Sequence, residues 1–259
     1  MGTAGPREPC GAMILAAGRG ERMRPLSDAT PKPLLEAGGR ALIVWQIEAL
    51  ARAGFTRIVI NAAHLADALV ARLGDGRALG VSIAWSIEQP EALETAGGIA
   101  TALPLLPPGP ALVVSADIHT DFDYASLLPR AAAMARDPAP PRVHLVMVDN
   151  PPYHPAGDFA LAPDPAGPGQ RIARDGGARL TFGNVGLYDT ALFAGLPRRT
   201  KLKLLPLFHD WIGQGIVSGE RHAGHWANVG TPDDLARLDA LLRAHPDPAS
   251  PTPTATTPR

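Results

Sequence analysis

The residues best suited to do chemistry lie near the N-terminus, in a glycine-rich segment after a short apolar run. Gly18 and Gly20 permit positive φ and close backbone approach to a ligand, so that amide N–H groups point at phosphate oxygens. Arg22 and Lys32 follow in the same loop and place two cations where an anion would sit. We predict that this segment, with Ala17 in its turn, binds the phosphates of a nucleotide.

The spacing excludes two common phosphate-binding loops. A dinucleotide-binding turn has the pattern Gly-x-Gly-x-x-Gly, and its third glycine position is held here by Met23. A Walker loop needs Gly-Lys-Ser/Thr at the start of a helix, and this tripeptide does not occur in the chain. The segment therefore indicates a different kind of nucleotide site.

Composition narrows the class of protein. At 259 residues the chain suits one α/β domain, and its net charge of -1 gives no support to binding of nucleic acid or a membrane surface. Cys10 is the single cysteine, which excludes a disulfide framework and a cysteine metal cluster. The sequence shows no secretory signal and no long apolar stretch, so we expect a cytoplasmic protein.

The order of elements predicts the fold class. Strand-like runs near 12–16, 57–61, 81–86, 111–116 and 143–148 alternate with helix-like runs near 41–53, 65–73, 97–103 and 124–136. This alternation favours an α/β fold with a mostly parallel sheet, right-handed crossovers and flanking helices.

The pattern loosens after residue 150, where Pro/Gly-rich loops interrupt short strands. We predict strands near 158–162, 180–182, 185–188 and 216–220, and helices near 203–214 and 232–244. We expect one domain over 12–244, with a first half at about 12–150 and a second lobe at about 151–231. Residues 1–11 are expected to be a flexible leader and 245–259 a disordered tail, because the tail is of low complexity.

Asp117 and Glu88 follow predicted strands at the same edge of the sheet as the glycine-rich loop. In open parallel sheets, ligands bind beyond the carboxyl ends of the strands. Asp117 ends a buried-strand run, and a carboxylate there suits a Mg²⁺ ion carried by a nucleoside triphosphate. The alternative is a turn or N-cap aspartate. His119 and Asp121 follow in what we interpret as a solvated loop.

The segment 86–98 is a candidate for contact with a nucleobase. Glu88 could accept a hydrogen bond from a ring N–H, and Gly97 and Gly98 would let the backbone approach the edge of the base. The alternative is a loop followed by a helix that Thr95 caps.

The pattern Gly-x-Gly-x-Arg-x-x-Pro, followed by Pro-Lys-Pro, resembles the sugar-phosphate nucleotidyltransferases, and the resemblance extends from about 12 to 243. It implies a Rossmann-like, glycosyltransferase-A-like fold and the joining of a nucleoside triphosphate to a sugar 1-phosphate, with release of pyrophosphate and with Mg²⁺ as cofactor. It further implies that Arg22 neutralises the leaving pyrophosphate, that Lys32 bridges the reacting phosphates, and that Mg²⁺ on Asp117 screens them.

The chain departs from the family at one expected metal ligand. A second carboxylate should lie in a Trp-x-Asp-x-Gly-Thr segment, and Asn228 stands at that position. An amide oxygen can coordinate Mg²⁺ but brings no charge. We therefore expect the metal to be bound by Asp117 and Asn228, with lower affinity than two carboxylates would give. A non-catalytic nucleotide-sugar sensor is the alternative from another functional class.

The second lobe carries the residues that the resemblance assigns to the sugar phosphate. These are Asn184 and Gly186 in an Asn-x-Gly-x-Tyr strand, Asp158 and Lys203; the alternatives are a plain strand with glycine bulges and a solvated lysine. Within the family, segments 93–95, 148–151, 157–159 and 218–220 are similar to members that use UTP and N-acetylmuramate 1-phosphate in cell-wall (peptidoglycan) recycling. Mannose-1-phosphate guanylyltransferases are the alternative. The oligomeric state is not predicted.

Overall fold

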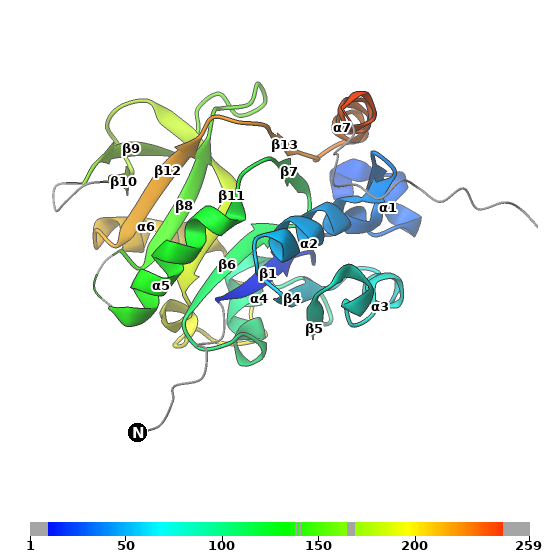
Figure 1. Cartoon of the computed structure of the whole chain (residues 1–259), viewed down its shortest axis with the longest axis horizontal. Helices are drawn as coiled ribbons and strands as arrows, with labels where there is room; N and C mark the ends of the chain where they lie inside the picture. The colour runs from blue at the N-terminus through cyan, green and yellow to red at the C-terminus, as the bar shows by residue number, and fades with distance from the viewer. Residues whose placement is uncertain (1–9, 138, 140, 165–168, 246–259) are drawn as a thin grey trace, which may run out of the picture.

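A computed structural model describes residues 10–137, 139, 141–164 and 169–245. These residues form a nine-stranded sheet in the order β5-β4-β1-β6-β11-β8-β12-β10-β9, flanked by helices (Figure 1). In chain order its strands are β1 (Gly11–Leu15), β4 (Arg57–Ala62), β5 (Ser82–Ile87), β6 (Pro110–Ser115), β8 (Val143–Val148), β9 (Phe159–Pro163), β10 (Gln170–Ala173), β11 (Arg179–Asp189) and β12 (Val217–His222).

The sheet has two parts that differ in strand direction. β5, β4, β1 and β6 are all parallel, as the alternation of elements predicts. β11 runs antiparallel to both β6 and β8, β12 is parallel to β8, and β10 and β9 add antiparallel pairs. β9 also pairs with the start of β11, so that β11, β8, β12, β10 and β9 close into a ring. The predicted α/β fold, a mixed sheet flanked by helices, is confirmed, and its continuous run of parallel strands lies in the first part.

Helices cover both faces of the sheet because apolar residues point alternately to each side of the strands. Ile14 and Val114 pack with α2 (Leu42–Arg52), α3 (Ala66–Leu73) and α5 (Leu128–Arg136). Met13 and Val113 pack on the other face with α4 (Glu94–Ala102) and α6 (Leu204–Gly213). Figure 1 shows α2 and α5 on the face toward the viewer. Buried strands with apolar residues on both faces are what a helix-covered parallel sheet requires.

A third, smaller core joins the N-terminal loop to the last helix. It contains Met23, Ala37, Leu42 and Val229 together with Leu238 of α7 (Pro232–Ala244). The loop after β1 is thereby attached to a helix from the end of the described chain.

Several short elements are absent from the sequence-based prediction. Two ribbons form, β2 (Glu36–Ala37) with β3 (Arg40–Ala41) and β7 (Ile118–Thr120) with β13 (Trp226–Asn228). The remaining short helices are η1 (Glu21–Met23), α1 (Leu26–Ala29), η2 (Lys32–Leu34), η3 (Arg77–Leu79), η4 (Leu103–Leu105), η5 (Tyr124–Leu127) and η6 (Thr190–Phe193). β10 is also unpredicted. The two strands predicted at 180–182 and 185–188 are one strand, β11, with an irregularity in its pairing to β8 between Phe182 and Gly186.

The predicted boundaries need one correction. The leader expected at 1–11 ends earlier, because Gly11 is already the first residue of β1. The rest of the leader, 1–9, and most of the tail, 246–259, lie outside the described residues. No helix among the described residues is both long and apolar enough to cross a membrane.

Candidate active site

A pocket of about 800 Å³ lies at the carboxyl ends of the parallel strands. Leu15 pairs with Asn61 of β4 and with Ser115 of β6, so three strands end side by side. Each strand is followed by residues that line the pocket: Ala16–Arg19 after β1, Ala63–Leu65 after β4, and Ala116 and Asp117 after β6. The pocket is therefore where an open α/β sheet binds its ligand.

The glycine-rich loop presents its backbone to this pocket. Ala17 and Gly18 line it, and a Cβ placed on Gly18 would meet no atom within 4 Å. Gly20 has a φ of 67° and accepts a hydrogen bond of 2.7 Å from the Ser27 hydroxyl. The predicted left-handed backbone is thus found at Gly20, while Gly18 supplies open space. The loop leaves room for a bulky anion beside its amide groups.

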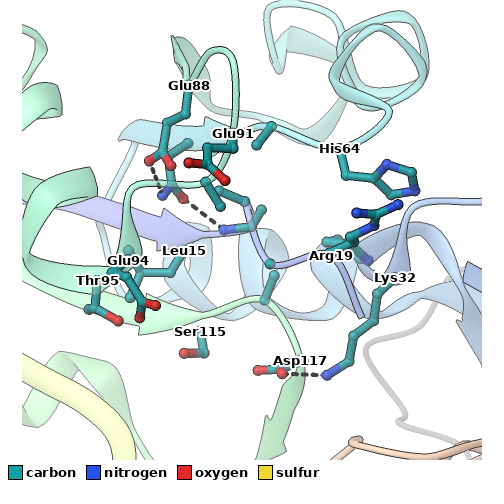
Figure 2. Close-up of a pocket in the computed structure, with 18 of the residues that line it drawn as sticks. Leu15, Arg19, Lys32, His64, Glu88, Glu91, Glu94, Thr95, Ser115 and Asp117 are labelled. Carbon is teal, nitrogen blue, oxygen red and sulfur yellow. Dashed lines mark hydrogen bonds and ion pairs between the residues drawn. The ribbon is translucent and has the colours of Figure 1, made fainter. Parts of the chain in front are cut away.

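Lys32 and Asp117 meet at one end of the pocket. The Lys32 Nζ lies 2.5 Å from Asp117 Oδ2, and the two side chains are 11% and 31% exposed (Figure 2). Two residues predicted independently from separate segments are therefore neighbours in space. The pair is thus a charge-assisted hydrogen bond between a largely buried lysine and a partly exposed carboxylate.

The β7–β13 ribbon places Asn228 beside Asp117. Asn228 pairs with Ile118, and the next amide, Val229 N, donates to the carbonyl oxygen of Asp117 at 2.8 Å. Asn228 Oδ1 is buried and has no hydrogen-bond partner among the described residues. A buried oxygen without a donor is costly, and a cation would satisfy it.

The side-chain oxygen atoms at this end of the pocket are suitable ligands for Mg²⁺. Asp117 and Asn228 offer hard oxygen atoms, which Mg²⁺ prefers. Among the described residues no group of three or more His, Cys, Asp or Glu side chains could hold a metal ion. Most of the coordination shell of a bound Mg²⁺ would therefore come from outside these two side chains.

Arg22 lies at the edge of the site, outside the set of residues that line the pocket. Its side chain is exposed, and its guanidinium lies against the backbone of Gly230. Glu21, the preceding residue, does line the pocket. The loop thus carries a cation at the rim that could reach a phosphate group inside.

Glu88 lines the pocket but is 2% exposed and engaged by the protein. Its Oε1 accepts from Asn61 Nδ2 at 2.7 Å and its Oε2 from Leu93 N at 2.7 Å. Asn61 Oδ1 in turn accepts from Ala16 N at 2.8 Å. Burial raises the pKa of the Glu88 carboxyl above its ordinary value, although these hydrogen bonds oppose the shift. The network ties β4 to the segments that follow β1 and β5.

Gly97 and Gly98 lie against other parts of the protein. A Cβ on Gly97 would collide with the Thr200 carbonyl, and one on Gly98 would lie 2.7 Å from Glu88 Oε1 and 2.9 Å from Asn61 Nδ2. Neither residue is among those that line the pocket. Packing within the protein accounts for both glycines, and their contact with a nucleobase stays a prediction.

The predicted sugar-phosphate residues do not gather around this pocket. Asp158 Oδ2 accepts from Phe182 N at 2.8 Å, and Asn184 has a φ of 56° at the irregularity of β11. A Cβ on Gly186 would meet the Tyr188 hydroxyl at 2.5 Å, so this glycine makes room for a core aromatic ring. Lys203 is exposed at the start of α6. Packing and backbone hydrogen bonds therefore account for Gly186 and Asp158.

The structure adds pocket residues that the sequence reasoning missed. Figure 2 shows Arg19 and His64 near Lys32, at a distance from Glu88. Lys201, whose Nζ lies 2.6 Å from Glu91 Oε2, also lines the pocket. Arg19 lies between Gly18 and Gly20 of the glycine-rich loop, so the sequence pattern could have indicated it. His64 and Lys201 come from loops without a distinctive pattern.

Comparison with known proteins identifies the class. The family model described as nucleotidyl transferase matches residues 11–153, more than half of the chain, and the chain belongs to this family. Its fold is shared by HddC from Yersinia pseudotuberculosis, with a TM-score of 0.69 at 20% identity over 90% of this chain and 99% of that one.

Sequence relatives extend over nearly all of the chain. It is 48% identical over 233 residues to the N-acetylmuramate alpha-1-phosphate uridylyltransferase of Neisseria meningitidis, covering 90% of this chain and 98% of that protein. The protein of the same name from Caulobacter vibrioides is 35% identical over 238 residues, 89% of this chain and 96% of that protein. A mannose-1-phosphate guanyltransferase of Debaryomyces hansenii is 40% identical over 118 residues, 44% of this chain and 32% of that protein.

Proposed function

We propose that this protein transfers a uridylyl group from UTP to N-acetylmuramate 1-phosphate and releases pyrophosphate. The observation that carries the proposal is the Lys32–Asp117 pair, which lies in a pocket beside the glycine-rich loop and next to Asn228. The choice of nucleotide and sugar is supported by relatives of that activity, which match the chain over about nine-tenths of its length.

The reaction exchanges one phosphoanhydride bond for another. An oxygen of the sugar 1-phosphate attacks the α-phosphorus of UTP, the bond to the β-phosphate oxygen breaks, and the electron pair leaves with pyrophosphate. The attacking phosphate is already an anion, so no side chain has to remove a proton. The task of the protein is to hold two anions together in line and to stabilise the developing charge.

Cations in the site offset the electrostatic repulsion between the two anionic substrates. Two unit negative charges about 4 Å apart repel by about 4 kcal/mol at an effective dielectric constant near 20. In this proposal Lys32 lies between the reacting phosphates, and Arg22 neutralises the pyrophosphate from the rim. Asp117 and Asn228 would hold Mg²⁺, which supplies further positive charge to the triphosphate.

The walls of the pocket orient the nucleotide. The backbone of Ala17 and Gly18 lines the pocket together with Glu88, whose network fixes the segment after β5. In this proposal the nucleobase lies toward Glu88 and the phosphates lie toward Lys32. We place the acceptor sugar toward the second lobe and the reaction in the cytoplasm, in peptidoglycan recycling.

A pyrophosphate-release assay tests the function. Each of the four common nucleoside triphosphates is combined with N-acetylmuramate 1-phosphate, N-acetylglucosamine 1-phosphate and mannose 1-phosphate in the presence of Mg²⁺. We expect the highest kcat/KM with UTP and N-acetylmuramate 1-phosphate. Preference for GTP and mannose 1-phosphate would instead identify a guanylyltransferase. Nucleotide or nucleotide-sugar binding without turnover for any pair would identify a sensor.

A further inference from the structure

Arg22 differs from the other cation of the proposed reaction in being unpaired. Lys32 is held by Asp117, whereas no carboxylate forms an ion pair with Arg22 among the residues that the structure describes. The guanidinium is exposed and lies on a short helix, η1, that begins directly after Gly20. Its charge is available to a ligand, and something else has to fix its place.

Gly230 provides a flat surface for this guanidinium. A Cβ built on Gly230 would lie 3.1 Å from one terminal nitrogen of Arg22, 3.3 Å from its Cζ and 3.4 Å from the other terminal nitrogen. Two of these distances are below ordinary van der Waals contact and the third is at its lower limit, so an added side chain would require the guanidinium to shift by a few tenths of an ångström. Gly230 is buried and does not have a positive φ, so its own backbone conformation does not require glycine.

The start of α7 fixes the backbone of Gly230 through the carboxylate of Asp234. Asp234 Oδ2 accepts hydrogen bonds from Gly230 N at 3.1 Å, Thr231 N at 2.8 Å and Thr231 Oγ1 at 2.7 Å. Asp234 Oδ1 is bound by Arg237 at 2.5 Å. The reciprocal capping of the helix uses Oδ2, and the ion pair with Arg237 uses Oδ1. Both oxygens of Asp234 are therefore engaged by donors other than Arg22.

The residues beside Arg22 and Gly230 are locked in one apolar cluster. Met23 and Val229 are both fully buried and pack with Leu238 of α7. Val229 N also donates to the carbonyl oxygen of Asp117. One segment of the chain, 228–231, therefore contacts the Asp117 backbone on one side and the Arg22 guanidinium on the other.

We propose that Gly230 is a positioning residue: its bare backbone, held by the capping of α7, sets the place of the Arg22 guanidinium. The proposal rests on the proposed function, in which Arg22 neutralises the leaving pyrophosphate. A side chain at position 230 moves the guanidinium by a few tenths of an ångström while leaving the charge in the protein. The expected effect is on turnover, because the leaving group gains charge only as the reaction proceeds.

The test compares Gly230→Ala with Gly195→Ala, in which the added Cβ meets no atom within 4 Å at a residue without positive φ. Turnover is measured by pyrophosphate release from UTP and N-acetylmuramate 1-phosphate, and folding by the thermal unfolding midpoint. For Gly230→Ala we expect kcat to fall about tenfold, with the KM for the sugar phosphate changed by less than about twofold because ground-state binding is retained. Gly195→Ala should match the wild type.

Combination with Arg22 variants shows whether Gly230 acts through Arg22. In an Arg22→Ala background, Gly230→Ala should cause no further loss, since residues that act as a unit are not additive. The same should hold in Arg22→Lys, which keeps the charge without a planar group. These cycles stay informative if Gly230→Ala also lowers the unfolding midpoint.

Three outcomes distinguish failure of the positioning role of Gly230 from failure of the proposed function. Multiplicative losses in the double variants, or unchanged kcat in Gly230→Ala, would overturn the positioning role while leaving the uridylyltransferase reaction in place. Unchanged turnover in Arg22→Ala would remove Arg22 from the reaction. No turnover of the wild type with any substrate pair would overturn the proposed function itself.

Discussion

The two parts of the sheet use their polar residues differently. After the parallel strands β1, β4, β5 and β6, polar groups point into one pocket, and Lys32 and Asp117 meet there. In the mixed part, Asp158 is bound by the backbone of β11 and Gly186 accommodates the ring of Tyr188. The first part has its chemistry at strand ends, whereas the second uses similar residues to hold an irregular sheet together.

Strand direction explains this difference. Parallel strands all end at the same edge of the sheet, so the residues that follow them lie close together. Neighbouring antiparallel strands end at opposite edges, so the residues that follow them do not all meet at one edge. A polar residue in the second part is therefore more often a support for its own loop. Four changes test how far this contrast holds.

Lys32→Ala should have the largest effect. Removing the cation that lies beside Asp117 should lower kcat by about 10²–10³-fold, by analogy with the loss of one oxyanion-stabilising donor. Arg77→Ala is the control, since Arg77 pairs with Asp75 on the surface of the same part. Steady-state pyrophosphate release measures both. Wild-type turnover in Lys32→Ala would move the reacting phosphates away from this end of the pocket.

Glu88→Ala should lower the free energy of unfolding. It leaves Asn61 Nδ2 and Leu93 N buried without their acceptor, which costs about 2–3 kcal/mol in the free energy of unfolding. Burial raises the pKa of Glu88, so its contribution is full below the unfolded value near 4.5 and is lost as pH rises through the raised value. Urea unfolding at several pH values should show the difference from wild type shrinking over that window. An unchanged difference would mean that Glu88 titrates normally.

Asp158→Ala tests the second part of the sheet. The hydrogen bond from Phe182 N and the contact with His154 are lost, and the free energy of unfolding should fall by about 1–2 kcal/mol. The KM for the sugar phosphate should change by less than about threefold. A tenfold rise in that KM with an unchanged unfolding midpoint would return Asp158 to the sugar site and break the contrast between the two parts.

Asn228→Asp should have the smallest effect. It places a second carboxylate beside Asp117, so the Mg²⁺ concentration for half-maximal rate should fall a few-fold, with the triphosphate still supplying most ligands. Calorimetric titration of Mn²⁺ in the absence of nucleotide gives a second readout, in which tighter binding is expected. Asp117→Asn should shift both measurements in the opposite direction. Unchanged metal binding in both variants would place the cation elsewhere.

The sequence indicated the parts of the site that are local. The glycine-rich loop and Asp117 follow predicted strands, Lys32 belongs to the pattern that resembles the family, and the structure brings all three to one pocket. Their roles in the reaction stay predictions. The parallel half of the sheet followed from the same alternation. The pairing of Asn228 with Ile118 joins distant segments through a ribbon of three residues on each side, which is too short to leave a periodic signal.

Glycine is the residue type whose role was hardest to predict from the sequence. Its presence shows that something approaches the backbone closely, but not what approaches. At Gly97 the neighbour is the Thr200 carbonyl, and at Gly98 it is the Glu88 carboxylate. Both neighbours come from loops whose positions depend on tertiary packing, so the sequence alone favoured a ligand where the structure has protein.

The closed ring at the end of the sheet has a consequence for association between molecules. Because β9 pairs with both β10 and β11, the strands of the mixed part are joined in a ring, in which β10 and β12 share one residue pair and β9 and β11 share two. Within the described nine-stranded sheet, β5 is the strand that pairs with one neighbour only, over its whole length. Exposed backbone groups on an edge strand are where another chain can add by hydrogen bonding. The longest continuous edge for such an addition is therefore β5, and surface changes meant to improve solubility or to attach a peptide strand belong there.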